Sequence, residues 1–502
     1  MYRLHISRSY ISMVMILMFL ASCSEGAKNI PPTSTAIPPT MAVTESSPMP
    51  DTHMGIGTIG LGDSLYPYFG NGGYDVQHYT LDLTVNDVAT SDFIGITAIE
   101  GTATQDLSAF NLDFIGFEIT SILVNGQPAN FKRFRQELTI TPTPPLVAGE
   151  SFTVEIQYHG SPDKFRSVAI PFQTGWVTFD KGSYVMSEPD GAASFFPVND
   201  HPLDKALYSF RVTVPKPFEV AANGVLSGTI DTDNQTTFLF EMNDPMASYL
   251  TTVDIGEFDL ETSQAGNGVP IRNYYSTGVS EDIRKPFELQ DEMLVFFSDT
   301  FGPYPFDVYG VLVMDTELGG ALENQTMSVF GFTDANDWDN LQLGIAHELA
   351  HQWFGDSVSV ADWRDIWLNE SFATYAEGLW LEHTDGREAL DEWVKALYAQ
   401  VLENRQYMSA PGEPAANSLF NGGVYSWGAL GLHALRLEVG DQEFFEILKT
   451  YYKRFEGGNV TTADFIAVAE EVSGKELSPF FDSWLYSRDL APIPALGLEA
   501  KQ

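Results

Sequence analysis

The alternation of apolar and polar residues predicts a β-rich first half of the chain. In residues 76–85 (VQHYTLDLTV) and 207–215 (LYSFRVTVP), apolar side chains recur at every second position, as in a strand with one buried face. Residues 122–129 (ILVNGQPA) place an Asn-Gly pair between β-like flanks, which is typical of a tight hairpin turn. We therefore expect an antiparallel β domain, saddle-like or sandwich-like in shape, over residues 59–256.

The second half has a helical pattern. Residues 281–302 show helical periodicity, and residues 308–315 (VYGVLVMD) form a short apolar run that predicts a strand. Gly440 and Gly474 stand where two of the later helices should end. We expect an α+β domain over residues 257–490, mostly helical in its C-terminal half, and a tail over 491–502. The expected helices after residue 340 are 340–355, 366–383, 387–404, 424–439, 441–454 and 462–473.

The N-terminus predicts export and a lipid anchor. Residues 1–22 carry Arg3 and Arg8 ahead of a short apolar run, as in a secretory signal peptide. The sequence LASC, which ends at Cys23, looks like the lipobox of bacterial lipoproteins and implies cleavage before that cysteine and its acylation. An ordinary signal peptide with an incidental cysteine is the alternative. Residues 23–58, rich in Pro, Ser and Thr, then form a linker that tethers the protein to the extracellular face of a membrane in the cell envelope.

Composition excludes some classes of function. The 502 residues include 26 basic and 68 acidic side chains, a net charge of −42, and removal of Arg3 and Arg8 makes this 24 − 68 = −44. Nucleic-acid binding needs clustered Lys and Arg, so no nucleic-acid partner is expected, and membrane contact should occur only through the anchor. With Cys23 as the only cysteine, disulfides play no part in stability.

Residues 347–351 (HELAH) predict a metal site. On a helix, His347 and His351 lie on one face and can present both imidazoles to one ion. Zn²⁺ suits such ligands and leaves a position for water, beside which Glu348 is placed as general base. Glu370, with eighteen residues between it and His351, is the expected third ligand of one Zn²⁺ per chain. The alternative is a core helix with two hydrogen-bonded histidines.

Four motifs extend this pattern into a family resemblance. The first motif is HELAHQWFG followed by WLNESFATY, and the others are GGALEN (319–324), VYSWGALGLHALR (424–436) and SEPDGAASFFPVNDHPLDKALYSFRVTVP (187–215). Together they resemble the motifs of the gluzincin aminopeptidases, which include aminopeptidase N and leukotriene hydrolase. The resemblance covers residues 60–490. It implies a thermolysin-like zinc peptidase domain behind the β domain, and hydrolysis of N-terminal residues from peptides with free N-termini.

The resemblance also implies roles for further residues. Tyr425 would donate a hydrogen bond to the oxyanion, unless it is one more aromatic in a helix. An aminopeptidase must also bind an α-ammonium group, and Glu323 and Glu188 are the expected carboxylates for it. The substrate would also contact the neighbours of Glu323, which are Gly320, Ala321 and Asn324.

The chain departs from the family's usual residues at several positions, none of them an expected ligand or the base. Leu322 replaces Met, Ser371 replaces Gly and Trp427 replaces Lys, while Val198, Asn199 and His201 alter the Phe-Pro motif. We expect no C-terminal lid domain and a more open site. The rival functions are a zinc endopeptidase, an epoxide hydrolase on the same site, and an inactive surface scaffold that only binds.

Overall fold

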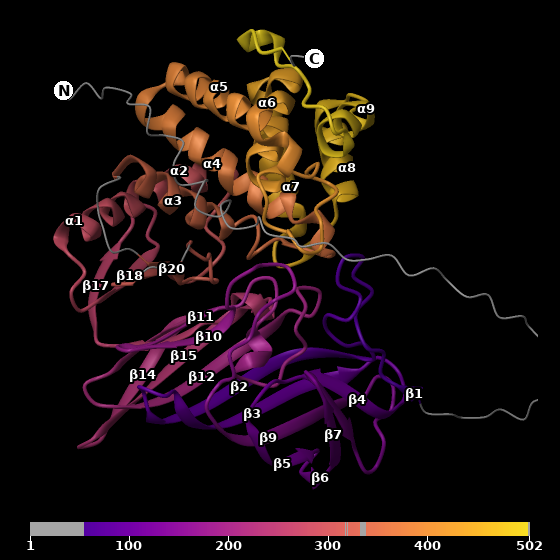
Figure 1. Ribbon diagram of the computed structural model, residues 1–502, viewed down its shortest axis with the longest axis vertical. Helices are drawn as coiled ribbons and strands as arrows, with labels where there is room; N and C mark the ends of the chain where they lie inside the picture. Colours follow the sequence, from indigo (N-terminus) through magenta and orange to yellow (C-terminus); the bar gives the residue numbers. More distant parts are fainter. Residues whose placement is uncertain (1–54, 317, 319, 332–337, 500–502) are drawn as a thin grey trace, which may run out of the picture.

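The computed structural model describes residues 55–316, 318, 320–331 and 338–499, and Figure 1 shows a β-sheet region below a helical region. The predicted signal peptide, Cys23 and the linker up to residue 54 lie outside the described residues. Among those described, no helix is both long enough and apolar enough to cross a bilayer.

The predicted β-rich first half is confirmed, and its described residues form three sheets. The largest has eight strands in the order β14 (Val225–Asp231), β15 (Gln235–Met246), β12 (Ala206–Pro215), β2 (Tyr74–Asp87), β3 (Asp92–Ala103), β9 (Ser151–Gly160), β5 (Glu118–Val124) and β6 (Gln127–Pro128). A second sheet is β1 (Gly55–Ile56), β4 (Leu107–Asp113), β8 (Glu137–Thr141) and β7 (Asn130–Phe134). A third is β10 (Gly175–Phe179), β11 (Gly182–Met186), β16 (Val253–Gly256) and β13 (Glu219–Ala222).

Among the described strands of the β region, most pairs are antiparallel, as predicted, but two pairs are parallel. β2 pairs with β12 in parallel, with Tyr79 opposite Tyr208, and β1 pairs in parallel with β4. The first pairing is possible because residues 88–205 return the chain to the end of the sheet at which β2 starts. The hairpin between β5 and β6 is confirmed: Asn125 and Gly126 both have positive φ, 50° and 73°, as a type I′ turn requires.

The second region opens with a four-stranded mixed sheet and continues in helices. Its strand order is β17 (Phe258–Gln264), β18 (Pro270–Ser276), β19 (Tyr309–Met314) and β20 (Ser328–Gly331). The helices are α1 (Glu281–Arg284), α2 (Gln290–Phe301), α3 (Trp338–His351), α4 (Trp367–Asp385), α5 (Arg387–Asn404), α6 (Gly428–Val439), α7 (Asp441–Phe455), α8 (Thr462–Ser473) and α9 (Ser478–Phe481), with a small sheet of β21 (Ser359–Val360) and β22 (Asn459–Val460). Gly440 and Gly474 end α6 and α8 with positive φ, as predicted.

The two regions are joined by polar contacts as well as by a continuous apolar core. Asp63 accepts a hydrogen bond from the backbone of Trp363 at 2.7 Å. Lys205 donates from Nζ to the carbonyls of Asp356 and Ser357, both at 2.9 Å. These contacts and the shared core therefore hold the β region and the helical region in a fixed position relative to each other. The boundaries 59–256 and 257–490 stay predictions.

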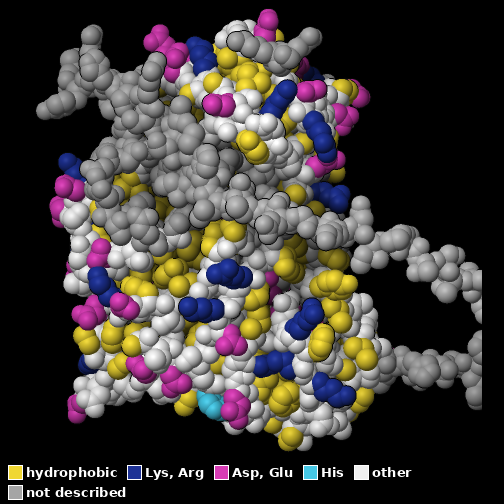
Figure 2. All heavy atoms as spheres, viewed as in Figure 1, with side chains coloured by type: hydrophobic (Ala, Val, Ile, Leu, Met, Phe, Trp, Pro, Cys, Tyr) yellow, Lys and Arg dark blue, Asp and Glu magenta, His cyan; other side chains and the backbone are white. Residues whose placement is uncertain are grey.

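Charged side chains on the face seen in Figure 2 are spread over both regions. On this face, Lys and Arg side chains and Asp and Glu side chains both occur on the two regions.

Candidate active site

Two packed helices bring the predicted ligands together. His347 and His351 lie one turn apart near the end of α3, and Glu370 lies in the first turn of α4, which packs against α3. Oε2 of Glu370 is 3.4 Å from Nε2 of His347 and 3.5 Å from Nε2 of His351. One ligand atom from each of the three residues thus lies within 4.8 Å of the others.

The second nitrogen of each imidazole, Nδ1, already has a hydrogen-bond partner in the protein. Nδ1 of His347 is 2.9 Å from Oε1 of Glu377, and Nδ1 of His351 is 3.0 Å from the carbonyl oxygen of Phe354. These partners fix each ring with Nε2 turned toward Glu370, which is the usual arrangement of a metal-binding histidine. Two imidazoles and a carboxylate match the ligand set of a catalytic zinc, so the group fits Zn²⁺.

Hydrogen bonds within the group shift the pKa values of Glu370 and His347 in opposite directions. Burial opposes ionisation of Glu370, but hydrogen bonds from His347 and His351 lower its pKa to about 2. Burial would lower the pKa of His347, yet hydrogen bonds to Glu370 and Glu377 raise it well above its ordinary value. The carboxylates around the two rings therefore attract positive charge, which a divalent cation supplies.

Glu348 lies beside the expected metal-binding residues. One of its oxygens groups with Glu323 and His351 within 4.8 Å. Its side chain is buried, and burial raises its pKa to about 7. A carboxylate with such a pKa can take and return a proton near neutral pH.

Tyr425 lies on a π-helical turn that precedes α6. The sequence predicted one helix over 424–439, but Gly423–Trp427 form a π-turn and α6 begins at Gly428. The Tyr425 ring stacks on His347, with centroids 6.0 Å apart and planes 22° apart. Burial, then the charge of Glu370, raises the pKa of Tyr425 well above its usual range, so its hydroxyl keeps the proton that it donates.

The two carboxylates that are expected to bind an amine belong to Glu188 and Glu323, and that of Glu323 lies within 4.8 Å of Glu348 and His351. Glu188 follows β11, and Glu323 lies in the segment between β19 and β20. In each, Oε1 is buried and accepts no hydrogen bond from the described residues. Burial, with the charge of Glu323 added, raises the pKa of Glu188 well above its usual range. The side chain of Asn324 donates to the carbonyl of Val185 at 3.5 Å, which links the two segments.

Comparison with known proteins assigns the chain to a family. Residues 286–484 match the Peptidase family M1 domain, and residues 75–250 match the Peptidase M1 N-terminal domain. The crystal structure of an M1 zinc metallopeptidase from Deinococcus radiodurans, a mutant bound to a Tyr-Ser-Ala substrate, superimposes with a TM-score of 0.79 at 34% identity, covering 87% of this chain and 99% of that one. The chain belongs to peptidase family M1.

Curated M1 relatives are longer than this chain. "Aminopeptidase N" of Streptomyces lividans is 30% identical over 60% of this chain and 38% of its own length. "Aminopeptidase M1-B" of Oryza sativa subsp. japonica is 27% identical over 59% of this chain and 36% of its own length. The chain thus spans little more than a third of the curated relatives it matches.

Within the M1 scaffold, two residues near the site went unnoticed in the sequence. Glu377, which fixes His347, lies seven positions after Glu370 and so on the same face of α4, and this spacing was the available signal. Gln352 follows His351 directly. Its Nε2 donates to the carbonyl of Glu323 at 2.7 Å, and its Oε1 accepts from the backbone of Thr326 at 2.8 Å. It therefore ties the Glu323 segment to the end of α3.

The departures from the usual M1 residues have structural roles here. Ser371 donates from Oγ to the carbonyl of Val424 at 2.5 Å, so it links the residue after Glu370 to the residue before Tyr425. A Cβ at Gly428 would lie 1.8 Å from Ser371 Oγ, so the serine needs glycine opposite it. Asn199 bonds the backbone of Asn71, and His201 lies 3.3 Å from Asp63, so both support the β region.

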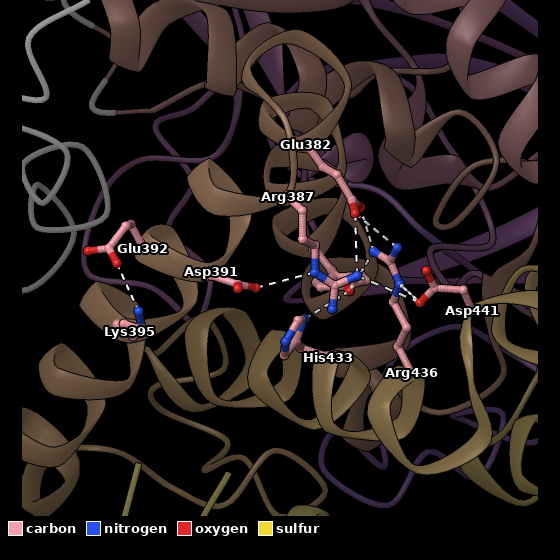
Figure 3. Close-up of polar contacts among 9 residues, drawn as sticks. Glu382, Arg387, Asp391, Glu392, Lys395, His433, Arg436 and Asp441 are labelled. Atoms are coloured by element: carbon pink, nitrogen blue, oxygen red, sulfur yellow. Dashed lines mark hydrogen bonds and ion pairs between the residues drawn. The ribbon is translucent and has the colours of Figure 1, made fainter. Parts of the chain in front are cut away.

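An ion network that centres on the buried Arg436 joins α4 to α6 (Figure 3). Arg436, which is 3% exposed, donates to Glu382 at 2.6 Å and to Asp441 at 2.8 Å. The hydroxyl of Tyr375 lies 3.1 Å from Nδ1 of His433. α4 carries Glu370 and α6 continues from the Tyr425 turn, so these contacts join the two helices that begin beside the candidate site.

Proposed function

We propose that this protein is a zinc-dependent aminopeptidase that hydrolyses N-terminal residues from peptides. The observation that carries the proposal is the proximity of unpartnered carboxylates to a group that could hold a metal. Glu323 lies within 4.8 Å of His351, which groups with His347 and Glu370. Glu323 and Glu188, whose pKa is raised by burial and then by the charge of Glu323, each have a buried carboxylate oxygen that accepts no hydrogen bond from the described residues.

The catalytic chemistry follows from the positions of the side chains. His347, His351 and Glu370 would hold Zn²⁺, which when bound polarises the scissile carbonyl and makes the attacking water more acidic. Glu348 accepts the proton of that water and returns it to the leaving amine. The hydroxyl of Tyr425 donates a hydrogen bond to the oxygen of the scissile carbonyl as negative charge develops there.

The unpartnered carboxylates account for the need for a free N-terminus. Ionising a buried carboxyl group that has no hydrogen-bond donor is costly, and for this reason burial raises the pKa of Glu188. An α-ammonium group supplies three donors and a positive charge, which favour the ionised form. The same contact places the first peptide bond next to Glu348. An endopeptidase does not bind an α-ammonium group, so it would not need the carboxylates of Glu188 and Glu323. A protein that only binds peptides would not need Glu348 and Tyr425 beside a metal-binding group. Nothing in the cavity specifically favours an epoxide.

The test uses the full chain loaded with zinc. Aminoacyl fluorogenic substrates, each with a free and an acetylated N-terminus, are assayed with and without a chelator. We expect chelator-sensitive cleavage of the free amines alone. Cleavage of the acetylated forms would indicate an endopeptidase, and zinc binding without any cleavage would indicate a binding scaffold.

The amine-binding role is tested by Glu323→Gln, with Glu392→Gln on the exposed face of α5 as the matched control. The first variant should lose most of the preference for free over acetylated substrates, and the control should keep it. An unchanged ratio in Glu323→Gln would refute the role of Glu323.

We also propose that the protein is a lipoprotein on the extracellular face of a membrane in the cell envelope. The support is the LASC sequence, which ends at the chain's one cysteine, Cys23, after an apolar run. Mass spectrometry of membrane-extracted protein should show a diacylated Cys23 at the N-terminus. An unmodified N-terminus on either side of Cys23 would contradict the anchor.

A further inference from the structure

An apolar pocket opens next to the proposed amine site. The loop between β9 and β10 contributes Ile170 and Phe172, the end of β11 contributes Met186, and the segment after β19 contributes Leu322. Phe420, in the loop before the π-turn, completes the wall. The hollow between them measures about 500 Å³, part of it open to solvent.

The positions of Glu188 and Tyr425 orient a substrate in this pocket. Both side chains line it, together with the apolar residues. If Glu188 accepts the α-ammonium group and Tyr425 faces the scissile carbonyl, the α-carbon between these two groups lies at the pocket. The first side chain of the peptide then enters the apolar hollow.

The charges around the pocket discriminate among possible side chains. Among the described residues that line it, Glu188 is the only charged one, and the α-ammonium group occupies it. Among the described lining residues, a substrate carboxylate would find no cation, and it would face Glu188 and the nearby Glu323. A substrate lysine or arginine would find no second carboxylate among those same residues once Glu188 holds the α-ammonium group. Phe172, Met186 and Phe420 are all partly exposed, so a large apolar side chain would cover them.

We propose that this pocket selects peptides whose N-terminal residue is large and apolar, such as Phe, Leu or Met, over acidic and small residues. The inference rests on the proposed function, because it assumes that Glu188 anchors the amine. An added methylene in an apolar pocket changes kcat/KM by about 10-fold or more. The kcat/KM for leucyl and phenylalanyl substrates should therefore exceed that for the alanyl substrate by at least about 10-fold. It should exceed the kcat/KM for the glutamyl substrate by a larger factor.

The test combines a substrate panel with pocket variants of the zinc-loaded full chain. Phenylalanyl, leucyl, alanyl, arginyl and glutamyl substrates are compared in the wild type, in Phe420→Ala and in Met186→Glu. Phe420→Ala should reduce kcat/KM for the phenylalanyl substrate about 10-fold relative to the alanyl one. Met186→Glu should raise kcat/KM for the arginyl substrate relative to kcat/KM for the leucyl substrate. Phe134→Ala, on the exposed strand β7, is the control and should leave the order unchanged.

Two readouts separate failure of this inference from failure of the proposed function. Cleavage of free amines with a flat or acidic preference would overturn the pocket's selectivity and leave the aminopeptidase intact. If no substrate is cleaved, calorimetric binding of phenylalanine amide and glutamate amide still tests the pocket. Tighter binding of phenylalanine amide, weakened by Phe420→Ala, would support it, and equal binding would overturn it.

Discussion

The two sides of the active-site cavity are built in different ways. We call the residues on α3, α4 and the π-turn (His347, His351, Glu370 and Tyr425) the helical wall, and Glu188 with residues 320–324 the amine wall. On the helical wall, each histidine has a protein partner for Nδ1. On the amine wall, Glu188 and Glu323 each keep a buried oxygen without a partner among the described residues.

This difference shows what each wall is prepared to receive. The helical wall is organised by the protein itself, so its geometry exists before any substrate arrives, as electrostatic catalysis requires. The amine wall is completed only by a ligand that brings donors and positive charge. Changes to the helical wall should therefore lower turnover for every substrate, whereas changes to the amine wall should alter which substrates are used.

Glu348→Gln should have the largest effect. The substitution keeps the size of the side chain and removes the proton acceptor, so kcat should fall by about 10²–10⁴-fold for all substrates. Zinc content, measured by atomic emission, should stay at one ion per chain because none of the three proposed ligands changes. A kcat within a few fold of wild type would show that another group accepts the proton.

Tyr425→Phe should have the next largest effect. It removes one donor to the oxyanion while the ring can still stack on His347, so kcat should fall by about 10²–10³-fold with little change in zinc content. The ratio of free to acetylated substrates should not change, because the phenol belongs to the helical wall. A change in that ratio without loss of kcat would place Tyr425 on the amine wall instead.

The contrast between the walls also explains what the sequence could predict. His347 and His351 lie four positions apart, so helical geometry alone places them on one face. The turn at Asn125–Gly126 and the helix end at Gly440 are equally local, because each needs a positive φ at a defined position. Such features depend on a few neighbouring residues, and the structure has them where they were expected.

Other features depend on residues that are distant in the chain. The alternation in β2 and β12 is the same whether the strands pair in parallel or not, so their parallel register was missed. The apolar pattern of 423–439 did not distinguish a π-turn followed by α6 from one continuous helix. That Glu188 lies near Glu323 came only from the family resemblance, because the two residues belong to different regions and no local spacing relates them.

Glu377→Ala tests whether the helical wall owes its order to its hydrogen bonds. Loss of the partner of His347 Nδ1 should weaken zinc binding about 10–100-fold, because the ring is no longer held in one orientation. Competition with a zinc chelator measures this affinity, and Glu392→Ala, an exposed glutamate on α5, is the control. At saturating zinc, kcat should recover most of its wild-type value. An affinity equal to that of wild type would mean that α3 alone orients the ring.

Asp254→Asn should have the smallest effect on activity, and it tests the support of the amine wall. Asp254 on β16 is fully buried, accepts a hydrogen bond from the backbone of Val185 at 2.9 Å and another from Thr252 Oγ1 at 2.8 Å. Burial raises its pKa from 3.8 to about 7. An asparagine can accept from Val185 and donate to the Thr252 hydroxyl, so both contacts survive.

The sign of the pH dependence follows from the raised pKa. Between pH 4 and pH 7 the carboxyl ionises in the unfolded chain but stays protonated in the folded one, so the free energy of unfolding falls as pH rises. At about 1.4 kcal/mol per pKa unit, this carboxyl alone lowers the wild-type value by up to about 4 kcal/mol over that interval. Denaturant unfolding at pH 5, 6, 7 and 8 should show a shallower decline in Asp254→Asn, with little change in kcat at pH 7. Parallel profiles for the two proteins would mean that Asp254 is ionised in the folded state, and that the amine wall rests on a charged carboxylate.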